Sequence, residues 1–238
     1  LVLPDGNPQD GEVAVSIPAG ALNTETEIGV KRLRASTVPR ANSSIIRSNP
    51  VSVYELTPDG QLFSRPVSLT LLYLDVDQDG LVDNWGLDER QLKVFWYDSS
   101  ADGWRYVGGA VDTLNNTVTV KVNHFSTYGF FTVDASQMNG EMYRPQEKVI
   151  TPNKDGRNDF VTFNGVQTYF SSLATGKVEE SKRKVYLYNL ANKLVRTLTD
   201  TDIWDGTDTD GNLVESGIYV YQFEIEGQVV TGTITITR

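Results

Sequence analysis

The sequence predicts an all-β protein that consists of two antiparallel β-sandwich domains in tandem. Apolar residues recur with period two in short segments, and clusters of Gly, Pro, Asp and Asn separate these segments. Helical periodicity is nearly absent. Because a strand of a sandwich has one buried and one solvated face, this alternation is the pattern that such strands require. At 238 residues, an all-β chain has room for one or two domains of this class.

The first domain is expected over residues 1–134. Its opening strand, 13–17, alternates and then stops at Pro18, Ala19 and Gly20, a turn-forming group. The spacing of the later candidates, with turn residues between them, is typical of an antiparallel sandwich. These further strands are predicted at 28–32, 51–56, 67–74, 92–97, 104–107, 117–122 and 128–133.

A polar stretch at 135–144 loses the alternation and is interpreted as a linker to a second domain at 145–238. Residues 226–228 turn between the last two strands and predict a hairpin. With about 95 residues, the second domain is close in size to an immunoglobulin-like sandwich. Its strands are predicted at 160–163, 168–173, 184–188, 194–198, 217–226 and 229–237.

The composition excludes several classes of function. The chain has 21 Lys and Arg against 31 Asp and Glu, a net charge of −10, so neither nucleic acid nor an anionic membrane is an expected partner. No apolar run approaches the ~18 residues that insert across a membrane. The absence of Cys and the single His exclude thiol chemistry, disulfides and zinc fingers. The start lacks an initiator Met and a signal-peptide pattern, which indicates a piece of a longer chain.

The segment DVDQDGLVD at 75–83 sets carboxylates at alternating positions before a Gly. Calcium takes about six to eight hard oxygen ligands, and this spacing lets three side chains converge while Gly80 makes the sharp turn. An EF-hand has Glu at the end of its loop, but Gly86 stands there and the flanks are predicted strands. We therefore predict a calcium loop between strands, closed by Asp88 or Glu89. The predicted ligands are Asp75, Asp77, Asp79, the carbonyl of Leu81, Asp83 and Glu89.

An acidic, solvated turn is the alternative for this loop, since Asp and Gly dominate turns for reasons unrelated to metals. Two further acidic runs, at 152–159 and 205–212, carry weaker metal patterns. The first also forms a turn without a metal, and the second is most similar to two successive turns.

The single histidine does not predict an enzyme with turnover. No recognisable motif positions an acid for His124, so a hydrolase triad has no support and no catalytic residue is assigned. Self-cleavage is the chemistry that stays open. Ser126 would attack the carbonyl of Phe125 with help from His124, and the resulting ester would hydrolyse. The favoured interpretation is structural, with His124 and Ser126 at a strand end and Phe125 in the core.

Aromatic residues gather in one part of the first domain. They form either a sugar-stacking platform or ordinary core and edge packing, and packing is favoured because aromatic residues dominate sandwich cores. A carbohydrate-binding module would use exposed indoles, for which Trp85 and Trp104 are the candidates. The group consists of Trp85, Trp96, Tyr97, Trp104 and Tyr106.

The run VSIPAGAL at 15–22 resembles the opening of ZU5 domains, the β-rich modules of ankyrins and netrin receptors. His124, Phe125 and Ser126 are similar to the self-cleavage tripeptide of some of these proteins. The resemblance covers residues 11–133 loosely and implies a β-sandwich for protein contacts, with self-cleavage as an option carried by that tripeptide. Similar modules of bacterial surface proteins carry an acidic loop like the one at 75–83.

The second domain contains four runs of interest: ITPNKDGRND at 150–159, VYLYNLANKLVRTL at 185–198, WDGTD at 204–208 followed by Gly211 and Asn212, and SGIYVY at 216–221. Together they resemble the immunoglobulin-like domain of the flagellar hook-capping protein FlgD over 145–238. The same pattern is found at the C-terminus of many large secreted bacterial proteins, including those that are sorted by the type IX or gliding-associated route. Asn192 and Lys154 stand where the family often has Gly, and Asn tolerates the positive φ of such a turn.

These observations predict a non-catalytic module pair at the C-terminus of a large extracellular or cell-surface bacterial protein. Its role would be that of a spacer, display, sorting or protein-interaction region. Calcium would stabilise the cysteine-free first domain, because a ligand that binds only the folded state stabilises it by mass action. The expected partners are other domains of the same chain and cell-surface or secreted proteins, with polysaccharide as an alternative. The chain itself is expected to be a monomer.

Overall fold

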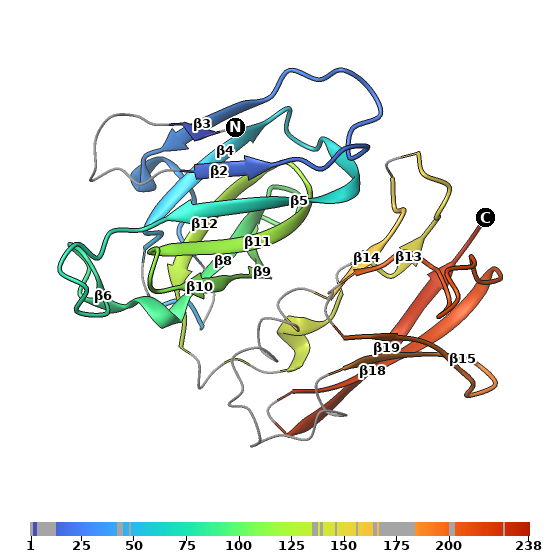
Figure 1. Cartoon of the computed structure of the whole chain (residues 1–238). Helices are drawn as coiled ribbons and strands as arrows, with labels where there is room; N and C mark the ends of the chain where they lie inside the picture. Colours follow the sequence, from blue (N-terminus) through green and yellow to red (C-terminus); the bar gives the residue numbers. More distant parts are fainter. Residues whose placement is uncertain are drawn as a thin grey trace. The chain divides into compact units, whose positions relative to one another are not determined.

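The computed structural model is an all-β protein, which confirms the predicted fold class (Figure 1). Its helical turns include the short 3-10 segments η1 (Ala35–Thr37) and η2 (Glu89–Gln91). Within the described residues, no helix has the length and apolar character needed to cross a bilayer. The structure describes residues 2–3, 13–41, 45–47, 49–134, 138, 140–145, 147–155, 157–163, 166, 184–199, 203–225 and 227–238.

The chain divides into two compact units, Leu1–Met138 and Asn139–Arg238. Part of the predicted linker 135–144 forms η4 (Gly140–Tyr143), which belongs to the second unit and contacts β19 (Gln228–Ile236). A Cβ on Gly140 would collide with the side chain of Val230, so the backbone of η4 approaches this strand closely.

One sheet of the first unit has the order β1, β2, β5, β11, β10, and all its neighbouring strands are antiparallel. β5 is its longest strand and lies between β2 and β11. It starts at Leu62, earlier than the predicted start at residue 67. The strands are β1 (Val2–Leu3), β2 (Val13–Ser16), β5 (Leu62–Leu72), β10 (Ala110–Asp112) and β11 (Thr117–His124).

The other sheet of the first unit has the order β3, β4, β12, β8, β9 and is also antiparallel. Each of its strands overlaps a predicted strand, so the antiparallel sandwich prediction is confirmed for this unit. The strands are β3 (Gly29–Leu33), β4 (Ser52–Thr57), β8 (Leu92–Asp98), β9 (Gly103–Gly108) and β12 (Thr127–Thr132).

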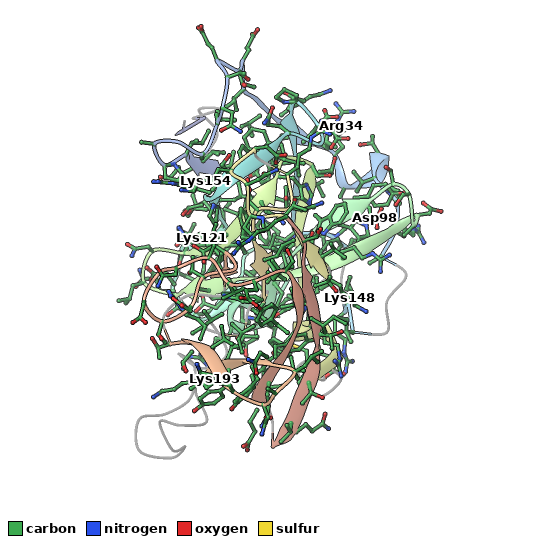
Figure 2. All side chains as sticks on the ribbon, turned by 90° about the vertical axis from the view of Figure 1, so that its right-hand side faces the viewer. Arg34, Asp98, Lys121, Lys148, Lys154 and Lys193 are labelled. Carbon is green, nitrogen blue, oxygen red and sulfur yellow. The ribbon has the colours of Figure 1, made fainter. Side chains whose placement is uncertain are left out.

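The core of the first unit lies between its two sheets and follows the alternation of the strands. Leu69 and Leu71 of β5 are fully buried, as is Phe130 of β12 on the opposite sheet. Each such side chain stabilises the fold by about 1.5–3 kcal/mol. The solvated face of the β5 sheet carries polar groups instead, and there the Nζ of Lys121, labelled in Figure 2, donates to the hydroxyl of Ser68.

The second sheet of this unit also buries aromatic residues on its outer face. Phe131 of β12 packs edge to face on Phe95 and Trp104, with ring centroids 5.3 and 4.9 Å away. Tyr106 contacts Phe95 at 5.5 Å, and all four residues are buried. The connection from β3 to β4 runs beside them, where the indole N–H of Trp104 donates to the Pro39 carbonyl (2.9 Å). Apolar side chains are therefore excluded from water on both faces of this sheet.

The second unit contains a five-stranded sheet and a two-stranded sheet among its described residues. The larger sheet has the order β13, β19, β18, β15, β16, in which only β13 and β19 pair in parallel. The predicted hairpin is confirmed, since β18 pairs with β19 along its whole length. The strands are β13 (Val149–Ile150), β14 (Val161–Thr162), β15 (Val185–Asn189), β16 (Leu194–Leu198), β17 (Ile203–Trp204) and β18 (Gly217–Ile225).

Aromatic contacts join the two sheets of the second unit into two layers. Phe163, next to β14, packs on Tyr221 and Phe223 of β18 with ring centroids 5.1 and 6.1 Å apart. Trp204 of the small sheet packs on Tyr219 at 5.4 Å. These contacts account for the layered β-sandwich architecture. The strand predicted at 168–173 lies outside the described residues.

Lys93 of β8 is a cation on the aromatic outer face of the first unit, where it pairs in register with Phe131. Its Nζ donates to the carbonyls of Leu92 (3.0 Å) and Arg90 (3.4 Å). No ion pair among the described residues includes it. Burial lowers the pKa of the Lys93 ammonium to about 8, because the charged form loses hydration.

We predict that Lys93 makes the stability of the first unit rise with pH. Its folded pKa lies below its unfolded value of ~10.4, so the unfolded chain binds more protons between about pH 8 and 10.4 and the free energy of unfolding increases across that window. Lys93→Met should remove this rise and stabilise the protein at pH 7 by about 1–3 kcal/mol. Urea unfolding from pH 7 to pH 10 measures both effects. The exposed Lys148 provides the control, because Lys148→Met should keep the wild-type slope.

Candidate metal centre

The acidic loop follows β5 and leads into a short hairpin of β6 (Leu81–Val82) and β7 (Leu87–Asp88), at one end of the first unit (Figure 1). The backbone reverses direction through left-handed residues, with φ 54° at Gln78 and 83° at Gly80. Glycine adopts this conformation without steric cost, which is the role that the sequence predicts for Gly80. The turn brings the two ends of the loop together, since the amide of Asp83 donates to the carbonyl of Leu74 (2.7 Å).

Three carboxylates converge inside this loop. Oxygen atoms of Asp75, Asp77 and Asp83 all lie within 4.8 Å of one another. Asp75 is buried, Asp83 is partly buried and Asp77 is exposed, so the cluster opens to solvent on one side. Carboxylate oxygens at this separation are close enough to share one hard cation.

Asp75 also holds the loop backbone. Its two carboxylate oxygens accept hydrogen bonds from the amides of Asp79 (3.1 Å) and Gly80 (3.0 Å). From the far end of the loop, Asp83 accepts a bond from the amide of Val76 (3.1 Å). Asp75 and Asp83 therefore combine two roles, because each fixes the backbone and each directs an oxygen towards the cluster.

The other predicted ligands make different contacts. Asp79 accepts a hydrogen bond from the amide of Leu81 (2.8 Å), and the Leu81 backbone pairs with Asp88 in the small hairpin. Asp88 accepts a bond from the amide of Arg90 (2.9 Å). Glu89 is buried and is not part of the three-carboxylate cluster. The structure thus brings together Asp75, Asp77 and Asp83 of the predicted set and directs the remaining side chains elsewhere.

Glu89 forms a buried polar pair behind the loop. The hydroxyl of Tyr73 donates to Glu89 Oε2 (2.7 Å), and the amide of Glu89 donates to the Gly80 carbonyl (3.2 Å). Burial, then the hydrogen bond and the negative charge of Glu89, raise the pKa of Tyr73 well above its ordinary value. Tyr73 therefore stays protonated as a donor, and Glu89 connects the loop to the end of β5.

Asn116 is a loop contact that the sequence analysis missed. It lies in the turn between β10 and β11, where its side-chain amide donates to the Asp75 carbonyl (2.9 Å) and its own carbonyl accepts from the amide of Tyr73 (3.0 Å). Its Oδ1 is buried and has no hydrogen-bond partner among the residues that the structure describes. Asn116 has a φ of 53°, a conformation that Asn adopts more readily than most residues. An Asn in a turn is the only sequence signal for this contact, and it is common to many turns.

The charge and the donor types of the loop fit a hard divalent cation. Residues 75–89 contain five Asp and one Glu, and no Lys or Arg. No ion pair between described residues reaches any of these carboxylates. Buried carboxylates are normally paired with a cation or bound to a metal. Asp75, Asp77 and Asp83 are the side chains that would share such an ion.

The two weaker acidic runs bind their own backbones. In the first, Asp155 donates its amide to Asn153 Oδ1 (3.0 Å) and Asp159 accepts from the amide of Lys154 (2.5 Å), while Gly156 lies outside the described residues. In the second, Asp205 accepts from the amide of Thr207 (3.2 Å), and Asp208 Oδ1 accepts from the amides of Asp210 (3.0 Å) and Asn212 (2.9 Å). Across the described residues, the three-carboxylate grouping occurs at the 75–83 loop.

The tripeptide of His124, Phe125 and Ser126 begins at the last residue of β11 and connects this strand to β12. Phe125 is fully buried, and its carbonyl accepts from the amide of Gly60 (2.9 Å) and lies 3.1 Å from His124 Nδ1. Ser126 is also buried, and its hydroxyl donates weakly to the Tyr97 carbonyl (3.5 Å). The tripeptide therefore has a packed phenylalanine and a carbonyl that two nitrogen atoms approach.

The aromatic group of the first unit is mostly a packing cluster. The prediction that Trp104 is an exposed indole is wrong, because its ring is buried. The connection from β3 to β4 lies beside the ring, and its Pro39 carbonyl accepts the indole N–H. Trp96 packs edge to face on His124, with ring centroids 4.7 Å apart. Trp85 is the candidate that stays accessible, with 37% of its surface exposed.

Comparisons with known proteins give partial matches to much larger bacterial proteins. No family model matches the chain. An amylopullulanase of Thermoanaerobacterium thermosulfurigenes is 27% identical over 124 residues, which are 51% of this chain and 6% of that enzyme. A C5a peptidase of Streptococcus pyogenes is 33% identical over 97 residues, which are 35% of this chain and 8% of the peptidase. The chain thus spans less than a tenth of the length of these curated relatives.

One solved structure also aligns with part of the chain. It belongs to PorZ, described as an essential bacterial surface component of the type-IX secretion system of Porphyromonas gingivalis. The alignment has a TM-score of 0.31 and 14% identity, and it covers 48% of this chain and 14% of the PorZ chain.

We predict that Asp75 stabilises the loop even without a metal. Asp75→Ala leaves the amides of Asp79 and Gly80 without their acceptor, so it should cost about 1–3 kcal/mol of unfolding free energy in the presence of a chelator. Asp77→Asn, at an exposed position of the same cluster, should change stability by less than about 0.5 kcal/mol under these conditions. Urea unfolding of both variants makes the comparison, and equal effects would contradict the backbone role of Asp75.

Proposed function

We propose that this chain is a non-catalytic pair of β-sandwich modules from a larger extracellular or cell-surface bacterial protein, and that calcium stabilises its first unit. The observation that carries the proposal is the convergence of Asp75, Asp77 and Asp83 in a loop rich in carboxylates and without a compensating Lys or Arg. The modules would serve as a spacer, display, sorting or protein-interaction region. The relatives agree with a modular role, since the matching segment is a small part of each of them.

The first unit is proposed to be ZU5-like and the second FlgD-like. Backbone geometry supports the second assignment at the two positions where the FlgD pattern often has Gly. Asn192 has φ 59°, and Lys154, labelled in Figure 2, has φ 64°. Both residues therefore adopt the left-handed conformation that glycine favours, so the turns of the pattern are kept without it.

Calcium would act on stability. The ion would neutralise the mutual repulsion of three carboxylates and connect the start of the loop, at Asp75, to its end, at Asp83. Because the unfolded chain does not hold these oxygens together, binding stabilises the folded state by RT ln(1 + [Ca²⁺]/Kd), which is about 2.7 kcal/mol at a hundred times Kd. In a chain without cysteine, such an ion replaces the disulfide that many small exported modules use.

Thermal unfolding in millimolar calcium and in excess chelator tests the calcium site. We expect the melting temperature of the first unit to fall on chelation, and Asp77→Ala to abolish this response with little effect on the chelated protein. Asp155→Ala, in the acidic run of the second unit, is the matched control and should keep the full response. A melting temperature that is the same in calcium and in chelator would contradict the proposal and show that the loop is a solvated acidic turn without a stabilising metal.

Self-cleavage between Phe125 and Ser126 is a second candidate function, favoured by the contacts of the Phe125 carbonyl. Hydrogen bonds from the Gly60 amide and from a protonated His124 Nδ1 would stabilise negative charge on that oxygen. The Ser126 hydroxyl would add to the Phe125 carbonyl carbon, the peptide C–N bond would break with proton transfer to nitrogen, and water would hydrolyse the ester. The products are a carboxylate at Phe125 and an amino terminus at Ser126.

Mass spectrometry of the purified chain tests this chemistry. Self-cleavage predicts a fragment that ends at Phe125 and another that begins at Ser126, and Ser126→Ala should yield the intact mass alone. Gly60 should be left unchanged in this experiment, because its amide is also a backbone contact of the fold. An intact wild-type chain after prolonged incubation at several pH values would remove the candidate.

A further inference from the structure

Exposed apolar side chains occur in the acidic loop, in the hairpin that follows it and in the turn between β10 and β11. Val76 and Leu114 are 80% and 85% exposed, and Leu81 and Trp85 are 40% and 37% exposed. In the described part of the first unit, one other large apolar side chain, that of Leu62, has a similar exposure, at 36%. We call the group of Val76, Leu81, Trp85 and Leu114 the apolar tip.

The two segments that carry the apolar tip are held together. Asn116, two residues after Leu114, donates its side-chain amide to the Asp75 carbonyl (2.9 Å), next to Val76. The Asn116 carbonyl in turn accepts from the amide of Tyr73 (3.0 Å). The turn between β10 and β11 therefore lies at the same end of the unit as the loop before β6 (Figure 1).

Local folding does not require these apolar residues. The turn at Leu114 is built by Asp112, whose carboxylate accepts from the amides of Leu114 (3.0 Å) and Asn115 (3.2 Å). Gly, Asn, Asp and Ser are the usual residues at such positions, since a solvated turn buries no side chain. Val76 stands between two acidic residues of the loop and is similarly solvated. Exposed apolar side chains on adjoining loops are typical of a surface that another molecule covers.

The surroundings of the apolar tip are strongly negative. Residues 75–89 contribute six carboxylates without a Lys or Arg, and Asp112 adds another from the neighbouring turn. Hydrogen bonds from Asn115 and Leu114 lower the pKa of Asp112, whose carboxylate is ionised at neutral pH. No ion pair of the described residues neutralises any of these groups.

We propose that the apolar tip and its carboxylates form a docking surface for a protein segment that carries both apolar and cationic side chains. The apolar contacts would supply binding energy, and the opposite charges would provide orientation and faster association. An anionic membrane suits the same surface less well, because its phosphates would be repelled by the loop. This inference does not depend on calcium, but a bound ion would reduce the negative charge and weaken the docking.

The probe for the test is a short, fluorescently labelled peptide of alternating Lys and Leu. Its affinity is measured by anisotropy at physiological ionic strength in the presence of a chelator, where distant charges are screened. The test variant is Val76→Ser with Leu114→Ser, and the control is Leu190→Ser with Val229→Ser, at positions of the second unit that are 70% and 60% exposed. All of these chains have the same net charge, so general attraction to an acidic protein cancels in the comparison.

We expect the Val76 and Leu114 double variant to bind the peptide about tenfold more weakly than the wild type, and the control variant to bind normally. A peptide of alternating Lys and Ser should bind weakly to all three chains. Calcium should weaken the wild-type complex if the loop holds the ion. Where calcium has no effect on either melting or peptide affinity, the metal proposal fails while the docking surface stands.

Two results would overturn the docking proposal. One is equal peptide affinity for the tip variant and the control variant, which would assign binding to overall charge. The other is calcium-dependent capture of the wild-type chain by phosphatidylserine vesicles, lost in the tip variant, together with no specific peptide binding. That outcome would assign the apolar tip to a membrane surface. Circular dichroism of both double variants verifies that each remains folded.

Discussion

The burial of one face of β5 is the constraint on which the first unit depends. This strand pairs with β2 on one side and β11 on the other, and its inward residues lie in the middle of the core. Leu69 and Leu71 are fully buried, each worth about 1.5–3 kcal/mol. Because side chains alternate along a strand, fixing these two residues also fixes the face on which every later residue of the strand emerges.

The end of that strand sets the position of the acidic loop. Past Leu71 the inward-facing positions become polar: Tyr73 is buried and donates to Glu89, and Asp75 is buried and accepts two loop amides. Buried polar groups must find partners, and these contacts supply them from the loop itself. The core and the oxygen cluster therefore lie on consecutive segments of the chain, β5 and the loop that follows it, so a metal bound in the loop would also stabilise the unit that β5 holds together.

The prediction of strands succeeded where the alternation was uninterrupted and failed where a local signal was misleading. The hairpin of β18 and β19 was readable because every second residue is apolar on both sides of Gly227. The strand predicted at 67–74 begins directly after Pro66, a residue type that interrupts most strands. In the structure the strand continues through Pro66, because the pairing of β11 shifts register between Val122 and His124 and leaves the proline at an irregular position. The sequence of one strand does not reveal such a register shift, because the shift depends on the strand with which it pairs.

The sequence by itself determined the all-β class, the turn at Gly80 and the presence of alternating carboxylates, since these are properties of neighbouring residues. Tertiary structure decided which oxygens converge. Asp79 binds the amide of Leu81 and Glu89 binds Tyr73, whereas Asp83 folds back beside Asp75. It also decided that Trp104 is buried beside Pro39, 65 residues away along the chain, and that Asn116 contacts the loop from a turn 41 residues beyond Asp75. The direction of a side chain is set by the hydrogen-bond donors and the packing around it, and the fold brings those groups from distant parts of the chain.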